Sequence, residues 1–400
     1  MGQSQYASVE QNVAADRQFR ARVTQVERSP LSSSVPAPAP GASSVPPLSS
    51  IHSSSAIDEV RRRLRLDPER IRQLRTALYK HCLDDAAITG NFPFSAELRR
   101  DWLELAQRID SDIDGASKLL LKNERGLLLE AVILRIASGR TTLCVSSQVG
   151  CAAACEFCAT GKMGIAQNLT TDEILDQVLL AGRILKKEGR RLRNIVFMGM
   201  GEPFHNESNL LEALRVLTSP KHFDFSPNRL LISSVGIPGG MLRCVEQFPR
   251  VRLALSLHSV RQEIREKLIP IASKHPLDLI QSTLRSINAR QPDPVMIEYL
   301  MLSGVNDSQS DADELAAWLS DLNVHVNLIP FNAIEGSPHL IPSDPESVRV
   351  FSEALKQAGL KATVRYSLGG DIAAACGQLV QQENRRIARH GTTTARSGPD

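Results

Sequence analysis

Short apolar segments alternate with longer helical segments from residue 139 onward, and this alternation limits the possible folds most strongly. The apolar segments have strand-like composition and begin at residues 141, 194, 229, 251, 295 and 324. Segments between them, such as "TTDEILDQVLLAGRILKKEG", have helical periodicity, and we expect Thr171 to cap that helix. The pattern predicts an α/β fold with right-handed crossovers, and six strands favour a partial (βα)6 barrel over a closed eight.

Polar and glycine-containing motifs follow the predicted strands. A cysteine-rich stretch follows the first strand, and "MGMGEP", "SSVG", "SLHS" and "PFN" close the second, third, fourth and sixth. In such barrels the chemistry gathers at the carboxyl ends of the strands. We therefore expect these motifs to surround one pocket.

The rest of the chain divides into an extension, an accessory domain and a tail. Residues 1–56 are rich in Ser, Pro and Ala and are expected to be disordered, as is the basic tail at 381–400. Residues 57–138 predict a mainly helical accessory domain, with helices over 57–83 and 95–109 and a strand over 126–136. Residues 139–380 form the predicted core.

Three closely spaced cysteines, Cys151, Cys155 and Cys158, form a C-x3-C-x2-C pattern. Disulfides pair thiols in twos, and closed zinc sites usually take four ligands. Three thiolates can instead hold three irons of an iron–sulfur cluster and leave the fourth iron free for a small chelating ligand. A zinc site completed by Cys144, or unligated thiols, are the alternatives.

The remaining sequence features bear on where the chain works. No apolar run reaches the ~18 residues of a membrane span. The first twenty residues lack the apolar centre of a secretory signal. Seven cysteines without paired spacing do not form a secreted disulfide framework, so we expect a reducing, cytoplasmic location and no membrane partner.

The cysteine pattern, with Phe157 at its aromatic position, resembles the hallmark of radical S-adenosylmethionine enzymes. The resemblance implies a [4Fe-4S] cluster that reduces S-adenosylmethionine and releases a 5′-deoxyadenosyl radical. Five ordered motifs extend the likeness to the RlmN/Cfr RNA adenine methyltransferases, over about residues 120–380. They are "RTTLCVSSQVGCAAACEFCATGKMG", "FMGMGEP", "SLHS", "NLIPFN" and "DIAAACGQL".

The resemblance implies methylation of an adenosine carbon, C2 or C8, in RNA. The expected target is 23S ribosomal RNA near the peptidyl transferase centre, and some family members also act on transfer RNA. Two S-adenosylmethionine molecules per turnover and an electron donor such as flavodoxin are implied too. Electron-poor ring carbons do not attack a methyl sulfonium, whereas a thiolate does.

Three residues match the family's catalytic positions. Cys376 resembles the cysteine that becomes S-methylated, and Cys144 resembles the resolving cysteine that forms a transient disulfide with it. Glu130 is the best match to the proton acceptor, with Glu124 as the fallback. The two cysteines that match no family position are expected to be structural, and they are Cys82 and Cys244.

Residues at the strand ends resemble the family's contacts to S-adenosylmethionine. Gly201 and Glu202, in "GMGEP", are expected to hold its amino group. Ser233 is the preferred serine of its segment and Ser234 the alternative. The other expected contacts are Ser256, Leu257, His258 and Asn332.

Basic residues are clustered although the net charge is only +3. Seven arginines lie between Arg61 and Arg75, and we expect the first four to contribute to RNA binding, namely Arg61, Arg62, Arg63 and Arg65. Three competing hypotheses remain. They are a radical enzyme for another RNA or a small substrate, a zinc-stabilised RNA-binding module, and an inactive paralogue.

Overall fold

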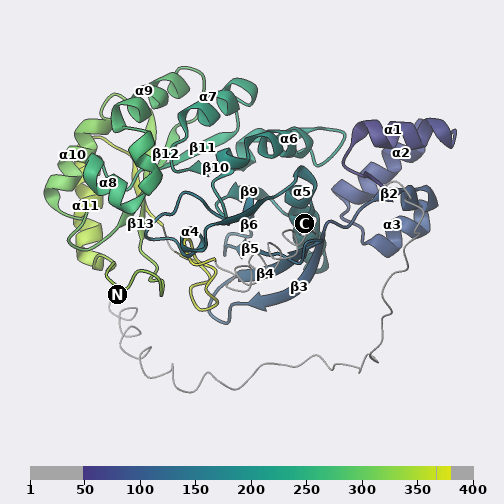
Figure 1. Cartoon of the computed structure of the whole chain (residues 1–400), viewed down its shortest axis with the longest axis horizontal. Coiled ribbons are helices and arrows are strands. Elements are labelled where there is room, and N and C mark those ends of the chain that lie inside the picture. The colour runs from purple at the N-terminus through teal and green to yellow at the C-terminus, as the bar shows by residue number, and fades with distance from the viewer. Residues whose placement is uncertain (1–47, 366, 380–400) are drawn as a thin grey trace, which may run out of the picture. The chain divides into compact units, whose positions relative to one another are not determined.

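The computed structural model describes residues 48–365 and 367–379, and a large mixed sheet is its central element (Figure 1). Ten strands of this described part form the sheet. In sheet order they are β14 (Ala362–Val364), β13 (Val324–Pro330), β12 (Val295–Met301), β11 (Arg252–Ser256), β10 (Leu230–Ser234), β9 (Asn194–Phe197), β6 (Thr141–Cys144), β5 (Leu128–Arg135), β4 (Ala116–Asn123) and β3 (Leu103–Asp110).

Within this sheet, β6 and β9–β14 are parallel to one another. The six strand segments predicted from the sequence correspond to β6 and β9–β13. The short strand β14 was not predicted, because three residues carry too little periodicity. Two ends of the sheet, β14 and β3, remain unpaired with each other, so the barrel is partial as expected.

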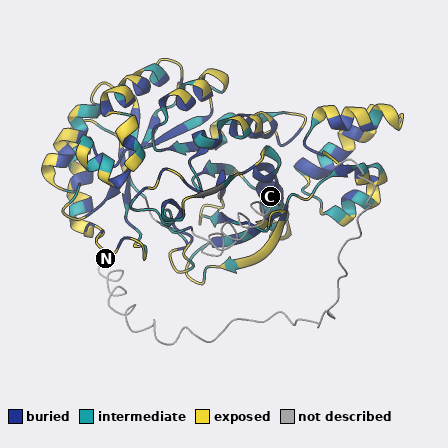
Figure 2. Ribbon diagram, viewed as in Figure 1, coloured by how far each residue is buried: buried dark blue, intermediate teal, exposed yellow. Residues whose placement is uncertain are grey.

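Amphipathic helices cover the outer face of the parallel strands (Figure 2). Their buried sides pack on the sheet and their outer sides are exposed, which is the pattern that helical periodicity predicts. The covering helices are α5 (Thr171–Lys187), α6 (Glu207–Thr218), α7 (Pro238–Gln247), α8 (Gln262–Leu268), α9 (Leu277–Asn288), α10 (Gln309–Leu319) and α11 (Pro345–Gln357).

Helix α5 is capped by Thr170, one residue before the predicted cap Thr171. Thr170 accepts a hydrogen bond from the backbone N–H of Glu173 (3.1 Å), and the Glu173 side chain accepts one from the Thr170 N–H (2.7 Å). This reciprocal pair requires a three-residue separation from Glu173, which Thr171 does not have. Thr171 instead donates to the backbone oxygen of Asn209 (3.3 Å).

The helix predicted over residues 95–109 is wrong. This region forms the two-residue strand β2 (Leu98–Arg99) and the eight-residue strand β3, which pairs antiparallel with β4. The backbone N–H groups of Trp102 and Leu103 both donate to the buried carboxylate of Asp176 on α5 (3.0 and 2.8 Å). Tertiary pairing and this anchor outweigh the helical propensity of the segment.

The accessory region is helical only in its first half. After β1 (Ser49–Ser50), its helices are α1 (Ser54–Arg63), α2 (Pro68–Arg75), the π-helical η2 (Thr76–Lys80), α3 (Asp85–Asn91) and the 3-10 helix η3 (Pro93–Glu97). Strands β3–β5 then continue into the main sheet, because Val132 of β5 pairs with Cys144 of β6. The predicted boundary at residue 138 therefore has no counterpart in the sheet.

The predicted disordered extension overlaps with structured residues. Ser49 and Ser50 form β1, and α1 begins at Ser54, so residues 48–56 are part of the fold. Residues 1–47 and 380–400 lie outside the described ranges, and so does the predicted tail. No helix within the described ranges is both long and apolar enough to cross a bilayer.

Asp176 makes the fold pH-dependent in a predictable direction. Burial raises its pKa to about 7, although its bonds to the Leu103 and Trp102 N–H groups oppose the shift. The folded state thus holds a proton that the unfolded chain releases between about pH 4 and pH 7, so this group's contribution to stability declines as the pH rises through that interval.

We expect Asp176→Asn to keep an acceptor oxygen and remove the buried charge. At pH 8 its free energy of unfolding should exceed that of the wild type by about 1–3 kcal/mol, and near pH 4 the difference should shrink. Denaturant unfolding at both pH values measures this. An equal difference at both pH values contradicts the assignment.

Candidate active site

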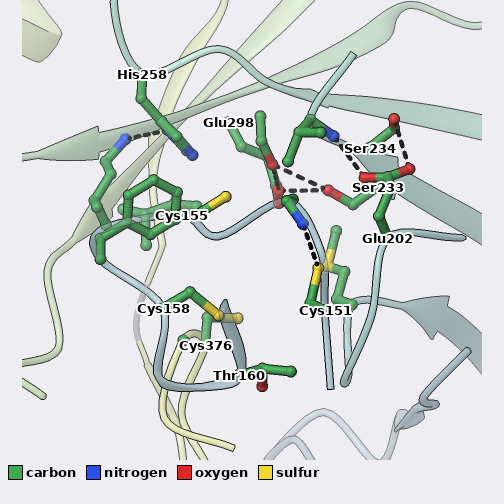
Figure 3. A pocket seen from close by; sticks show the side chains of 18 of the residues that line it. Cys151, Cys155, Cys158, Thr160, Glu202, Ser233, Ser234, His258, Glu298 and Cys376 are labelled. Carbon is green, nitrogen blue, oxygen red and sulfur yellow. Dashed lines mark hydrogen bonds between the residues drawn. The ribbon is translucent and has the colours of Figure 1, made fainter. Parts of the chain in front are cut away.

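A cavity opens at the carboxyl ends of strands β9–β12, where parallel strands deliver their loops to one rim (Figure 3). Its cavity volume is about 140 Å³, and it is partly open to solvent. Most of the residues that the sequence motifs single out line it, and these are Cys151, Cys155, Cys158, Gly201, Glu202, Ser233, Ser234, Ser256, His258 and Cys376. The predicted convergence of the motifs at one rim is therefore observed.

The cysteine loop begins after β7 (Gln148–Gly150), which pairs with β8 (Ile165–Asn168), and leads into the short helix α4 (Ala159–Met163). The Ala153 N–H donates to the Cys151 sulfur (3.4 Å). Gly161 allows the loop to close, since a Cβ there would lie 2.8 Å from the backbone nitrogen of Cys155. The fold therefore wraps this loop tightly around its own thiols.

Burial makes these thiols poor acids on their own. It raises the pKa of Cys151 to about 12, and it raises those of Cys155 and Cys158 as well. For Cys155 the charges of the two neighbouring thiols add to the effect of burial. Thiolates at this place thus need a strongly positive ligand, and metal ions deprotonate coordinating thiols outright.

The three cysteines fit an iron–sulfur cluster better than a single metal ion. Within the described ranges, groups of three His, Cys, Asp or Glu side chains that could hold one ion are absent. In a cluster each thiolate binds a different iron, so the sulfurs surround a space instead of meeting at a point. The zinc alternative also required Cys144, which lines a neighbouring cavity and not this one.

Glu202 is a buried carboxylate at the cavity wall. It accepts hydrogen bonds from the Val235 N–H (2.9 Å), the Phe204 N–H (3.1 Å) and the Ser234 hydroxyl (2.9 Å). Burial still raises its pKa to about 7. A carboxylate in this setting is stabilised by an incoming ammonium group.

The glycine before Glu202 is required by packing. Gly201 has a φ of +102°, and a Cβ at this position would lie 2.6 Å from the Cβ of Gln148. The Gln148 side chain in turn accepts a hydrogen bond from the Glu202 N–H (2.9 Å). Gly201 therefore allows the second strand end to approach the start of the cysteine loop.

Ser233 and Ser234 both line the cavity but have different partners. Ser234 donates to Glu202, whereas Ser233 donates to Glu298 Oε2 (2.8 Å). Ser256 also donates to Glu298 Oε2 (3.4 Å). Both serines that the sequence leaves as alternatives, Ser233 and Ser234, therefore lie next to each other in the wall of the cavity.

Glu298 and Arg365 are cavity residues that the sequence did not reveal. Glu298 lies on β12 with its Oε1 atom 3.6 Å from the Arg365 guanidinium. The only signal was a single carboxylate in the apolar segment "VMIEYLML". Arg365 follows β14, the strand that was not predicted.

His258 is neutral and held in place. Its Nδ1 accepts a hydrogen bond from the Leu300 N–H (3.1 Å), and burial lowers its pKa to about 3. The Phe157 ring packs edge-on against it, with 4.7 Å between ring centroids. Leu257 is fully buried, its backbone N–H donates to the Glu298 backbone oxygen (3.0 Å), and its backbone oxygen accepts from the Arg265 guanidinium.

Cys376 lies where two cavities meet. It lines the cavity of the three cysteines and also a second cavity that contains Cys144 and Val132 (Figure 3 shows the first). Asn332 holds it through a hydrogen bond to the Cys376 backbone oxygen (3.2 Å). Arg365 lines both cavities as well.

The two thiols of the second cavity differ in their electrostatic surroundings. Burial raises the pKa of Cys144 to about 12, and the nearby Cys376 adds to this shift. Burial also raises the pKa of Cys376. The Arg365 charge opposes the pKa shift of both thiols, and its interaction with Cys376 is the larger of the two. Cys376 is therefore the thiol that a fixed positive charge favours as a thiolate.

Glu130 is fully buried on β5, two residues before Val132, so both side chains point to the same face of the sheet. Its Oε1 atom lies 3.5 Å from the Lys118 ammonium group. The fallback Glu124 is exposed and pairs with Arg99 (2.5 Å). Of the two candidates, Glu130 is therefore the buried one, and its strand pairs with β6, which carries Cys144.

Comparisons with known proteins agree with this site. The family model described as "Radical SAM superfamily" matches residues 145–317. A Rhodopirellula baltica protein, described as a probable RNA methyltransferase, is 56% identical over 84% of this chain and 89% of its own length. The dual-specificity RNA methyltransferase RlmN 1 of Myxococcus xanthus is 37% identical over 81% of this chain and 91% of its own.

A solved structure is similar over the same extent. The crystal structure of a radical SAM methyltransferase from Sphaerobacter thermophilus matches with a TM-score of 0.78 and 35% identity. The match covers 83% of this chain and 99% of that one.

The fold and the cysteine loop place this protein among the radical S-adenosylmethionine enzymes. Its relatives define the group further, and the chain belongs to the RlmN/Cfr family of radical RNA methyltransferases. Membership implies a [4Fe-4S] cluster, S-adenosylmethionine and an RNA substrate.

We expect Cys158→Ala to lose the iron and acid-labile sulfide that the anaerobically reconstituted wild type carries, since one of three thiolate ligands is gone. Cys82→Ala, outside both cavities, is the matched control and should keep its iron. Elemental analysis and the brown absorbance give the result. Stoichiometric zinc in place of iron contradicts the assignment.

Proposed function

We propose that this enzyme methylates a ring carbon of an adenosine in RNA by way of a methyl group carried on Cys376. The observation that carries the proposal is the position of Cys376, between the cavity of Cys151, Cys155 and Cys158 and the cavity of Cys144. The proposed target is 23S ribosomal RNA near the peptidyl transferase centre, with transfer RNA as a second substrate. The proposed methylated carbon is C2 or C8.

The first step is a polar displacement at Cys376. Its thiolate attacks the methyl carbon of S-adenosylmethionine, a sulfur–carbon bond forms, and the broken bond leaves its electron pair on the departing S-adenosylhomocysteine. Arg365 favours this step because its charge stabilises the Cys376 thiolate.

A second S-adenosylmethionine serves the radical step. When bound at the three cysteines, an iron–sulfur cluster would supply the electron that cleaves it to methionine and a 5′-deoxyadenosyl radical. The S-methyl group of Cys376 loses a hydrogen atom to that radical. The resulting methylene carbon adds to the adenine ring, so Cys376 and the RNA become covalently linked.

Two further residues release the product. The ring is restored when the proton on the substituted carbon leaves to Glu130 and one electron leaves to an acceptor. A cluster held by Cys151, Cys155 and Cys158 would supply that acceptor. The Cys144 thiolate then attacks the Cys376 sulfur, forms a disulfide and breaks the bond to carbon. The departing carbon keeps the electron pair, takes up a proton and becomes the methyl group.

The rim residues are proposed to hold S-adenosylmethionine. Glu202, beside Gly201, would accept hydrogen bonds from its ammonium group. Among the described residues, the donors to this buried carboxylate are two backbone N–H groups and a hydroxyl, which are all neutral. The other proposed contacts are the Ser233, Ser234 and Ser256 hydroxyls and the neutral His258 ring, which line the cavity, and Leu257 and Asn332, which are sequence neighbours of lining residues.

The accessory helices supply a basic surface for RNA. A groove between α1, α2 and the loop after α6 is lined by five basic residues, Arg61, Arg72, Arg75, Lys80 and Lys221. Of the four predicted arginines only Arg61 lines it, and Arg63 forms an ion pair with Glu97. Basic side chains that neutralise phosphates make RNA affinity fall with salt.

The methyl-transfer proposal is tested by anaerobic reaction with fragments of large-subunit RNA, digestion and nucleoside mass spectrometry against C2- and C8-methyladenosine standards. We expect the wild type to form one of these products, and Cys376→Ala to form none, because the methyl carrier is missing. Cys144→Ala should accumulate RNA covalently bound to protein, since the link cannot be resolved. Cys82→Ala should match the wild type.

Methyladenosine at normal rates from Cys376→Ala contradicts the carrier role. Failure of the wild type with large-subunit and transfer RNA alike contradicts the proposed substrate.

We expect simultaneous alanine substitution of Arg61, Arg62, Arg63 and Arg65 to weaken RNA binding and to reduce the slope of log affinity against log salt by about 1 for each phosphate that the variant no longer neutralises. The double variant Arg285→Ala and Arg349→Ala removes exposed, ion-paired arginines elsewhere and is the control. Binding isotherms at several salt concentrations measure the slope. An unchanged slope refutes the role of these arginines.

A further inference from the structure

The loop that carries Cys376 is fastened to the antiparallel strands β3–β5. The Asp114 carboxylate accepts a hydrogen bond from the Gly369 N–H (2.7 Å). In the opposite direction, the Asp371 carboxylate accepts from the Ser111 hydroxyl (2.9 Å) and the Asp112 N–H (3.2 Å). The turn between β3 and β4 therefore holds the first part of this loop from both sides.

The loop also packs closely on β4. A Cβ at Gly369 would lie 2.9 Å from the Cβ of Ala374 and 3.0 Å from that of Ala116 on β4. The Ala373 backbone has a φ of +49°, in the left-handed region. The loop thus turns sharply against the strand just before it reaches Cys376.

Lys118, on β4, connects this loop to the proposed proton acceptor. Its ammonium group lies 3.3 Å from the backbone oxygen of Ala373 and 3.5 Å from Glu130 Oε1. The Lys118 side chain is only 12% exposed, and that of Glu130 is fully buried. One cation therefore touches both the loop that presents the substituted carbon and the carboxylate proposed to deprotonate it.

We propose that Lys118 is a positioning residue that fixes the Glu130 carboxylate and the Cys376 loop relative to one another for proton removal. This inference rests on the proposed function. The proton passes from the substituted ring carbon to Glu130, and the electron leaves as described above, so Lys118 itself gains and loses nothing. A proton acceptor must lie within hydrogen-bond reach of its donor, which a displaced loop or carboxylate would prevent.

Another lysine on β4 provides a matched control. Lys122 also pairs with a glutamate, Glu104, at 3.3 Å, but both side chains are largely exposed. Neither lysine–glutamate pair lines a cavity, so the two pairs differ in their burial and in the contact of Lys118 with the Ala373 oxygen. Replacing Lys122 by Met removes an ion pair from the same strand and should leave the reaction unchanged.

The experiment uses the full-length, anaerobically reconstituted enzyme and an RNA fragment in a single turnover. The quantity measured is the ratio of RNA–protein adduct to methylated adenosine. We expect Lys118→Met to raise this ratio about tenfold or more, because addition can occur while proton removal is slowed. Lys118→Arg, which keeps the charge, should restore most of the wild-type ratio, and Lys122→Met should match it.

A second readout does not depend on turnover. Hydrogen exchange of the backbone over residues 369–376, measured without S-adenosylmethionine and RNA, should speed up in Lys118→Met and not in Lys122→Met. Lys118→Gln keeps a donor for the Ala373 oxygen but removes the charge beside Glu130. It should therefore exchange almost like the wild type and still accumulate adduct.

A wild-type ratio in Lys118→Met overturns the proposal. If that variant does not fold, a wild-type ratio in Lys118→Gln overturns it equally. A wild type that forms neither adduct nor methyladenosine contradicts the proposed function instead, and the exchange measurement then still decides whether Lys118 holds the loop.

Discussion

The site depends on the docking of the C-terminal loop onto the cysteine loop. The Ala159 N–H donates to the Gly377 oxygen (2.7 Å), and the Thr160 hydroxyl donates to the Leu379 oxygen. Gly377 has a φ of +85°, and a Cβ at this position would lie 3.0 Å from the Phe157 backbone oxygen. The two loops are therefore too close together for a larger residue at position 377 without a shift. These contacts bring Cys376 to thiols more than two hundred residues earlier in the chain.

Burial of ionisable groups gives the cavity its chemistry. Thiols and carboxylates are held away from water, and burial raises the pKa of Cys151, Cys376 and Glu202. Such groups are stabilised by positive ligands, and a metal cluster and a sulfonium with an ammonium group are both positive. Arg365 is a fixed cation that lines both cavities, and its charge interacts more strongly with Cys376 than with Cys144.

Some parts of this structure could be predicted from the sequence, and physical reasons separate them from the rest. The parallel strands were predictable because strands buried on both faces are short, continuous apolar segments. Strand β3 was not, because it is an exposed edge strand whose place is set by β4 and Asp176. Motif residues such as Glu202 were predictable, whereas Glu298 and Arg365 are single charged residues that only the folded sheet brings together.

The central claim is that Cys376 carries the carbon and Cys144 releases it, and peptide mapping after one turnover tests it most directly. The reaction would be run with RNA and without added thiols, then quenched in acid and digested. The account predicts a peptide in which Cys144 and Cys376 are joined by a disulfide, in an amount equal to the methylated adenosine formed. Methylated adenosine that accumulates while both thiols stay free would contradict it.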